Sequence, residues 1–159
     1  AIVHKKLGNG HKLYIVGDGV EKNKIQSRIL ELGIQSSVEL LGQLPNMDTL
    51  NLMRRAKIYC MSSFAESFGM VLLEAMYNGV PQIAYDVRVG PRNLVQNGVT
   101  GFLIPDGDEE AFASRIAELF TDSAKWESMS ASSKKRVLLF SENNVIPKWE
   151  QIINLTSNL

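Results

Sequence analysis

Two glutamates lie eight positions apart, and two carboxylates at such a spacing can contact two parts of one polar ligand. Glu66 lies in a turn. Glu74 lies within the run from Met70 to Met76, and all residues of this run except Glu74 are apolar. A helix that is apolar on almost every side is expected to be buried. Because a buried carboxylate is costly unless it is paired, Glu74 either has a basic partner or lines a polar cavity.

The residues between the glutamates predict an anion site at the start of this helix. Ser67 is the predicted N-cap, and Gly69 would let a ligand approach the first-turn amides closely. Free amides together with the helix dipole favour an anion, most naturally a phosphate. Glu74 would lie roughly 9 Å along the axis from the helix start. A diphosphate there could have one sugar near each carboxylate; the alternative places Glu66 in solvent and Glu74 in a core ion pair.

The elements that would position these residues alternate between short apolar runs and amphipathic stretches. The predicted strands span 12–16, 38–42, 57–61, 81–85 and 100–104. The predicted helices span 21–32, 47–56 and 69–77, followed from about residue 108 by two or three more that are interrupted near 141–144 and by Pro147. This alternation predicts an α/β fold: one Rossmann-like parallel sheet with helices on both faces, plus C-terminal helices, in a single domain of residues 1–159. Ligands of such sheets bind at the carboxyl ends of the strands, which are followed here by residues 17–19, 42–46, 62–70 and 86–91.

Composition excludes several classes of protein. The 159 residues are 45% hydrophobic, which is enough for a core, and 17 Lys and Arg balance 17 Asp and Glu. A protein that binds nucleic acid through its phosphates usually carries a basic excess, so no nucleic-acid partner is expected. The sequence contains no apolar run long enough for a transmembrane segment and no signal-peptide pattern. These features predict a cytoplasmic domain.

Two motifs resemble known ligand-binding motifs, but neither is interpreted as a binding site. Gly17-Asp18-Gly19 begins like a dinucleotide fingerprint, but Lys22 stands where its third glycine belongs. Asp106-Gly107-Asp108 imitates a metal-binding D-x-D, yet it directly precedes a predicted helix, so a turn and an N-cap are expected.

Other reactive side chains are given structural interpretations. His4 and His11 are predicted to lie at the surface, Arg88 and Arg92 are predicted to be solvated, and Cys60 within an apolar strand is predicted to be a core residue.

The ordered set of motifs resembles family GT4 of the retaining glycosyltransferases, over nearly the whole chain. Glu66 to Met76, followed by Gly79-Val80-Pro81, is similar to the E-x7-E signature in the C-terminal, nucleotide-sugar-binding domain of that GT-B fold. Further similarity lies in 16–19, 38–42 and 97–105, and in a tail with Phe140-Ser141 and Trp149. The resemblance implies transfer of a hexosyl group from a nucleoside-diphosphate sugar, with UDP favoured, to a glycan, glycolipid or surface-polymer acceptor. It also implies catalysis without a metal or other cofactor.

Each site residue takes its expected role from this resemblance. Glu66 would contact the donor-sugar hydroxyls as the catalytic residue, and Glu74 would hold the ribose. Ser67 belongs to the donor site, as do the backbone amides of Phe68, Gly69, Met70 and Val71, which would serve the sugar and diphosphate. Gly42 and Leu44 would lie beside the base, and Gly17 would border the pocket floor. One departure is Asn93, which stands where the family often has an acidic residue.

The chain begins in what reads as the end of a helix, with Ile2, Val3 and Leu7 followed by Gly8-Asn9-Gly10. We expect a fragment that lacks the first strand, the diphosphate-binding Arg and Lys of the family, and the N-terminal acceptor domain. The isolated chain is then expected to be inactive, and the parent is compatible with peripheral membrane association. The alternatives are a non-catalytic nucleotide-sugar-binding or interaction module, and a GT-B-fold nucleotide-sugar epimerase.

Overall fold

The computed structural model describes residues 1–156 and alternates strands with helices, as the sequence predicts. The described strands are β1 (Leu13–Val16), β2 (Val38–Gly42), β3 (Tyr59–Met61), β4 (Gln82–Tyr85) and β5 (Gly101–Ile104). The helices of the first two thirds are α1 (Ile2–Leu7), α2 (Lys22–Glu31), α3 (Asn46–Arg55), α4 (Met70–Tyr77) and α5 (Gly90–Leu94). The C-terminal part consists of α6 (Glu109–Thr121), α7 (Ser123–Val137), a 3₁₀ turn at Leu138–Phe140 and α8 (Glu142–Thr156).

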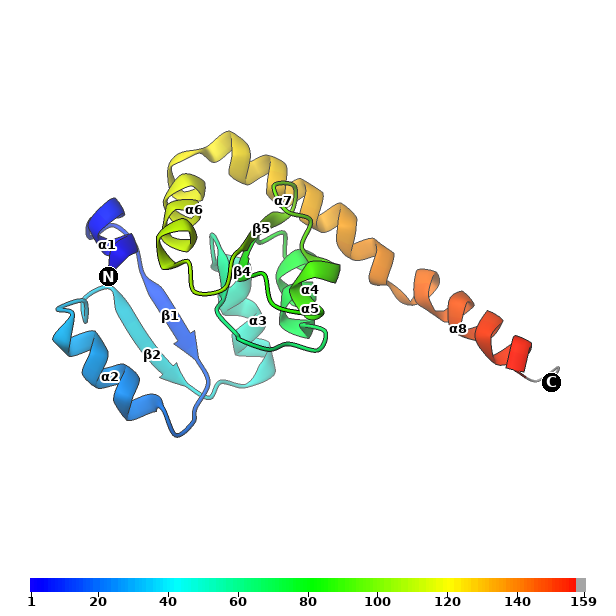
Figure 1. The fold of residues 1–159 in the computed structure, drawn as a ribbon, viewed down its shortest axis with the longest axis horizontal. Coiled ribbons are helices and arrows are strands. Elements are labelled where there is room, and N and C mark those ends of the chain that lie inside the picture. The colour runs from blue at the N-terminus through cyan, green and yellow to red at the C-terminus, as the bar shows by residue number, and fades with distance from the viewer. Residues whose placement is uncertain (157–159) are drawn as a thin grey trace.

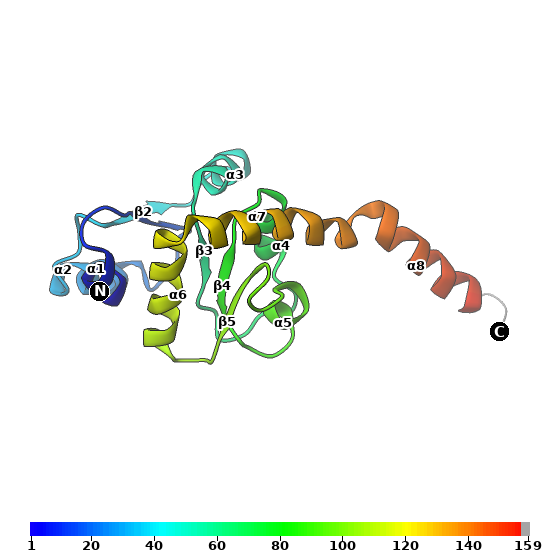
Figure 2. The same ribbon diagram turned by 90° about the horizontal axis from the view of Figure 1, so that it is seen from above.

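All described strand pairs are parallel, which confirms the α/β class, but the strands form two sheets instead of one. β1 pairs with β2, and β3, β4 and β5 form a second sheet in that order. Figures 1 and 2 show the small sheet set to one side of the larger one, with its strands running across the direction of β3 and β4. The single continuous sheet expected from the sequence is therefore divided.

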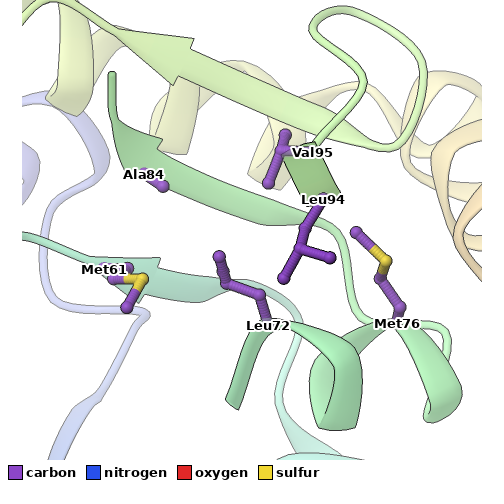
Figure 3. Packing of buried hydrophobic residues seen from close by; sticks show 6 residues of the cluster. All are labelled: Met61, Leu72, Met76, Ala84, Leu94 and Val95. Carbon is purple, nitrogen blue, oxygen red and sulfur yellow. The ribbon is translucent and has the colours of Figure 1, made fainter. Parts of the chain in front are cut away.

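The core is built on both faces of the larger sheet, because successive residues of β4 point to opposite faces. Ala84 packs with Leu72 and Met76 of α4 and with Leu94 of α5, and Figure 3 shows these side chains converging between the sheet and the two helices. Ile83 belongs to the opposite cluster, whose other members come from β5, α6 and α7: Phe102, Ile104, Leu119 and Met129. The predicted placement of helices on both faces is thus confirmed for this sheet.

The unit made of β1, α2 and β2 buries little. None of the side chains of α2 is buried, and Leu13 and Tyr14 of β1 are 45% and 44% exposed. α1, which precedes this unit, contacts it through His4 Nδ1, 3.1 Å from Ser37 Oγ, and packs on its other side against α6, with an ion pair of 3.4 Å between Lys6 Nζ and Glu110 Oε2.

The C-terminal helices differ in two respects from the prediction. A break between α7 and α8 is present, but it falls at residues 138–141, before the predicted 141–144. Pro147 lies inside α8 and does not interrupt it. Figure 1 shows α8 extending away from both sheets, and Trp149 on it is 61% exposed. Within residues 1–156, no helix combines the length and apolar character that crossing a membrane would require.

Candidate functional site

The start of α4 presents backbone donors that the protein leaves unused. Gly69 has φ of +90°, a left-handed conformation that side chains disfavour, and a Cβ there would lie 3.0 Å from Leu72 Cδ1. Leu72 N–H donates to the Gly69 carbonyl at 2.8 Å. In the described part of the chain, the N–H groups of Gly69, Met70 and Val71 have no hydrogen-bond acceptor. This arrangement suits an anion.

Ser67 is not the N-cap of this helix, so that prediction is wrong. The cap position is Gly69, two residues later, and no side chain caps the helix. Because the left-handed turn at Gly69 starts the helix directly, exposed Ser67 is left in the preceding turn.

Glu66 is held in place by the loop that follows β4. The N–H of Phe68 donates to Glu66 Oε1 at 3.3 Å, and the N–H of Gly90 donates to the Glu66 carbonyl at 3.1 Å. A Cβ at Gly90 would lie 2.8 Å from Glu66 Cγ, so only glycine allows this approach. The alternative of a freely solvated Glu66 does not describe this half-buried, bonded residue.

Val89, the residue before Gly90, is the one described non-glycine residue with positive φ, at +85°. A β-branched residue in that region is strained. It forms an isolated parallel bridge with Glu66, which keeps the two loops in register. No pattern in the sequence indicates this strain, because valine is not a residue that marks left-handed backbone.

Glu74 has no partner for its carboxylate among the residues that the structure describes. Its backbone carbonyl accepts a hydrogen bond of 2.8 Å from Asn78 Nδ2, but no ion pair involves its side chain, which is half-buried. The core ion pair considered from the sequence is therefore not formed. Burial raises the pKa of Tyr59, and Cys60, Glu74 and Glu66 raise it further, so both glutamates act on this one phenol.

Apolar side chains at the start of α4 are more exposed than the sequence predicts. Met70 is 60% exposed, Val71 37% and Phe68 40%, whereas Leu72, Ala75 and Met76 are buried. The expectation that α4 is buried on almost every side is thus wrong, since only one face packs on the sheet. Phe68 also contacts Phe140 of the tail, with ring centroids 6.4 Å apart.

The remaining predicted residues form a second group at the carboxyl ends of β1 and β2. Gly17 N–H donates to the Gly42 carbonyl at 2.7 Å, and half-buried Leu44 follows in the connection to α3. A Cβ at Gly42 would lie 3.9 Å from Lys22 Nζ, which pairs with Asp18 Oδ2 at 2.9 Å. That hydrogen bond from Lys22, with a second from the Gly19 amide, lowers the pKa of Asp18.

Lys22 lies beside the residues at the ends of β1 and β2, and the sequence did not identify it as a site residue. Its place in the sequence counts against a dinucleotide fingerprint. Lys22 is the first residue of α2, shortly after β1, so its ammonium group lies beside Gly42.

The two groups are not brought into contact. The Gly17 group belongs to the small sheet, the Glu66 group follows the larger one, and no described hydrogen bond or ion pair joins them. A cavity of about 400 Å³ lies between the two units. It is lined by Arg28 of α2 and Leu32 just after it, by Ser62 and Tyr85, and by residues of α1 and α6.

Asp108 caps a helix as predicted, whereas Cys60 is half-buried and lies in none of the three core clusters described. Asp108 Oδ1 accepts a hydrogen bond of 2.9 Å from Ala111 N–H, which confirms it as the N-cap of α6. No group of three or more potential ligands within residues 1–156 could hold a metal ion. Burial raises the pKa of the Cys60 thiol to about 12, and the Arg92 side chain, 57% exposed, pairs with Asp86, with Nη2 3.1 Å from Oδ2.

The two histidines are not surface residues, so that prediction is wrong. Both are half-buried, with ring centroids 5.8 Å apart, and the His11 ring lies against Phe120 at 6.2 Å. His4 Nδ1 is 3.1 Å from Ser37 Oγ. They join α1 to the body of the protein because the segment folds back on α6.

Comparison with known proteins agrees with this arrangement. The chain is 34% identical over 143 residues to the exopolysaccharide phosphotransferase SCO2592 of Streptomyces coelicolor, covering 90% of this chain and 15% of that protein. It is 28% identical over 160 residues to a Campylobacter jejuni α-1,4-N-acetyl-D-galactosaminyltransferase that is named for an undecaprenol-linked saccharide, covering 99% of this chain and 44% of that protein. The structure of Anabaena HepE in complex with UDP matches with a TM-score of 0.81 and 26% identity, over 99% of this chain and 44% of that one.

The chain thus spans less than half the length of these relatives. The sequence profile described as Glycosyl transferases group 1 matches residues 1–136, which include both glutamates, the turn at Gly69 and the Gly90 loop. The chain therefore belongs to the glycosyl transferases group 1 family.

Proposed function

We propose that this chain is the donor-binding domain of a retaining glycosyltransferase that takes a hexosyl group from a nucleoside-diphosphate sugar. The acceptor is a glycan, glycolipid or surface polymer. In this proposal Glu66 contacts the sugar hydroxyls and Glu74 the ribose hydroxyls. Ser67 and the amides of Gly69, Met70 and Val71 serve the sugar and the diphosphate, and the amide of Phe68 joins them once it gives up its bond to Glu66 Oε1.

One observation carries the proposal: the unused N–H groups at the start of α4 lie between two carboxylates that have no basic partner among the described residues. The donors suit the diphosphate, since a helix start offers free amides and a positive dipole end. Unpaired carboxylate oxygens are acceptors for sugar hydroxyls. The exposed Phe68, Met70 and Val71 would be covered by a bound donor.

The base would lie at the small sheet. Gly17, Gly42 and Leu44 are there, and Lys22 would approach the diphosphate from the same side. UDP is the favoured nucleotide, because HepE, which matches over 99% of the chain, binds UDP. Binding would require the small sheet and α4 to face one another across the nucleotide.

The chain would belong to a longer parent with an acceptor domain and a further strand beside the small sheet. The support for this is the exposure of β1 and α2 and the partial coverage of the relatives. The chain alone then transfers no sugar, because one wall of the cleft is missing. The parent works without a metal, on the cytoplasmic side, in solution or in peripheral contact with a membrane.

The test is calorimetric titration of the 159-residue chain with UDP, GDP, ADP and their glucose conjugates. Glu74→Gln should weaken UDP and UDP-glucose binding alike, by about tenfold for the lost charged hydrogen bonds. Glu66→Gln should leave UDP binding unchanged and remove the gain that the sugar provides. Glu150→Gln, on exposed α8, is the matched control.

Equal loss of UDP and UDP-glucose binding in Glu66→Gln would contradict the assignment of Glu66 to the sugar. Unchanged binding in Glu74→Gln would contradict its assignment to the ribose. Sugar transfer by the chain alone, above that of Glu66→Gln, would show that no second domain is needed.

A further inference from the structure

A second cavity, of about 520 Å³, opens at the edge of the larger sheet opposite to the candidate donor site. Its wall includes Lys57, which comes just before β3, and Asn78 and Gly79, which come just before β4. Because the strands are parallel, these residues lie at their amino ends, whereas Glu66 follows the carboxyl end of β3. The other walls come from the end of α3 and from α7, which Figure 2 shows running past these strands.

The cavity gathers positive charge that the protein does not neutralise. Four cationic side chains line it, against one carboxylate: Arg54, Arg55, Lys57 and Lys134, against Glu127. In residues 1–156, none of these four cations is in an ion pair, although seven ion pairs occur elsewhere in that range. The whole chain has zero formal net charge, so this is a local concentration.

Neutral groups hold two of the cations in place. Arg54 Nε donates to Asn78 Oδ1 at 3.2 Å, and its Nη1 donates to Asn51 Oδ1 at 3.4 Å. Lys57 Nζ donates to the Phe120 carbonyl at 3.0 Å and lies 5.3 Å from that ring's centroid. These contacts hold both cations without neutralising them, because every acceptor is uncharged.

The floor of the cavity depends on a glycine. Gly79 is buried, has φ of +68°, and a Cβ there would lie 2.9 Å from Ser130 Oγ and would collide with the stem of Lys134. The absence of a side chain at Gly79 therefore lets Lys134 of α7 come down toward the end of α4. Two arginines in the last turn of α3 are ordinary for a helix C-terminus. It is unusual, however, that lysines from two other segments line the same cavity as these arginines.

We propose that this cavity is a second binding site, for a small, multiply charged phosphate anion such as a diphosphate or a phosphorylated metabolite. Arginine forks and lysine ammonium groups suit phosphate oxygens, and Ser123 and Ser130 of α7 add neutral hydroxyl groups. The site is distinct from the donor site because the two lie at opposite ends of the strands and at opposite ends of α4. It does not depend on the proposed function.

The experiment titrates inorganic pyrophosphate into the isotopically labelled 159-residue chain at low ionic strength, followed by amide NMR and calorimetry. Saturable shifts are expected at the amides of 55–57, 78–80 and 123–134. Arg55→Gln combined with Lys134→Gln should weaken binding by about tenfold. Lys135→Gln combined with Lys148→Gln removes the same charge from exposed positions outside the cavity and should change affinity little.

Shifts confined to residues 66–71 would overturn the proposal, because pyrophosphate would then occupy only the donor site. An equal loss of affinity in both double variants would also overturn it, since that is the behaviour of unspecific charge attraction. The shift map of the unaltered chain distinguishes the two sites even if a variant fails to fold.

Discussion

The backbone N–H of Gly90 donates to the carbonyl of Glu66 at 3.1 Å, and this bond ties the loop after β4 to the first site glutamate. Gly90 lies so close that a Cβ on it would be 2.8 Å from Glu66 Cγ and 3.0 Å from the Glu66 carbonyl oxygen. The position of Glu66 is therefore set by a residue 24 positions away in the sequence as much as by its own turn.

Gly90→Ala should lower the free energy of unfolding by about 1–3 kcal/mol, the usual cost of forcing a methyl group into packed surroundings. It should also remove the gain in affinity that the donor sugar provides, because Glu66 has to move. Urea melts and calorimetry measure the two effects. Gly10→Ala is the control, because a Cβ there meets nothing within 4 Å. An unchanged free energy of unfolding in Gly90→Ala would show that the loop accommodates the methyl group without strain.

Val89→Gly should raise the free energy of unfolding by roughly 1 kcal/mol, because relief of a strained φ outweighs the entropy cost of glycine. Val99 is the matched control, since it is also exposed but lacks positive φ. Val99→Gly should lower the free energy of unfolding by about 1 kcal/mol. Thermal melts of the two variants provide the comparison, and losses of the same size at both positions would argue against strain at Val89.

Glu74→Gln should change the free energy of unfolding by less than about 1 kcal/mol, because no partner is left behind by the neutral amide. Breaking a buried ion pair would instead cost about 3–5 kcal/mol. Glu118→Gln is the comparison, since Glu118 pairs with Arg115 at 2.7 Å and with Lys125. Urea denaturation of both variants should show the larger loss at Glu118, and the reverse order would mean that Glu74 has a structural partner.

Acid should destabilise the chain through His11. Burial lowers the pKa of His11 from 6.5, and His4 and the amino terminus lower it further. Below pH 6.5 the unfolded chain therefore takes up a proton more readily than the folded one, and stability falls as the pH drops through that window. Melting temperatures measured above and below this window should differ less in His11→Gln than in the unaltered chain. The same drop in both would exclude His11 as the cause.

The sequence predicted the strands and α4 well, because each coincides with an apolar run; for β3, β4, β5 and α4 that run reflects packing in the core of the larger sheet. It did not predict α5, since Gly90-Pro91 reads as a turn and the helix depends on contact with Glu66. The sequence also placed the N-cap of α4 at Ser67, because serine is a common capping residue. The left-handed conformation of Gly69 could not be predicted, because glycine adopts several backbone conformations. The division into two sheets could not be predicted, because sheet continuity is set by contacts that no local pattern encodes.

The side chains of β1, α2 and β2 are mostly exposed, and this affects the dynamics of the unit that they form. A unit with no buried side chain in its helix is expected to open at a lower free energy than a core strand, so we expect β1, α2 and β2 to exchange their amide protons faster than the larger sheet. A nucleotide that bridges Gly42 and the start of α4 would then have to immobilise that unit. Part of its intrinsic affinity is consumed in this ordering, and any neighbour that holds the unit in place beforehand acts as a positive heterotropic effector of nucleotide binding.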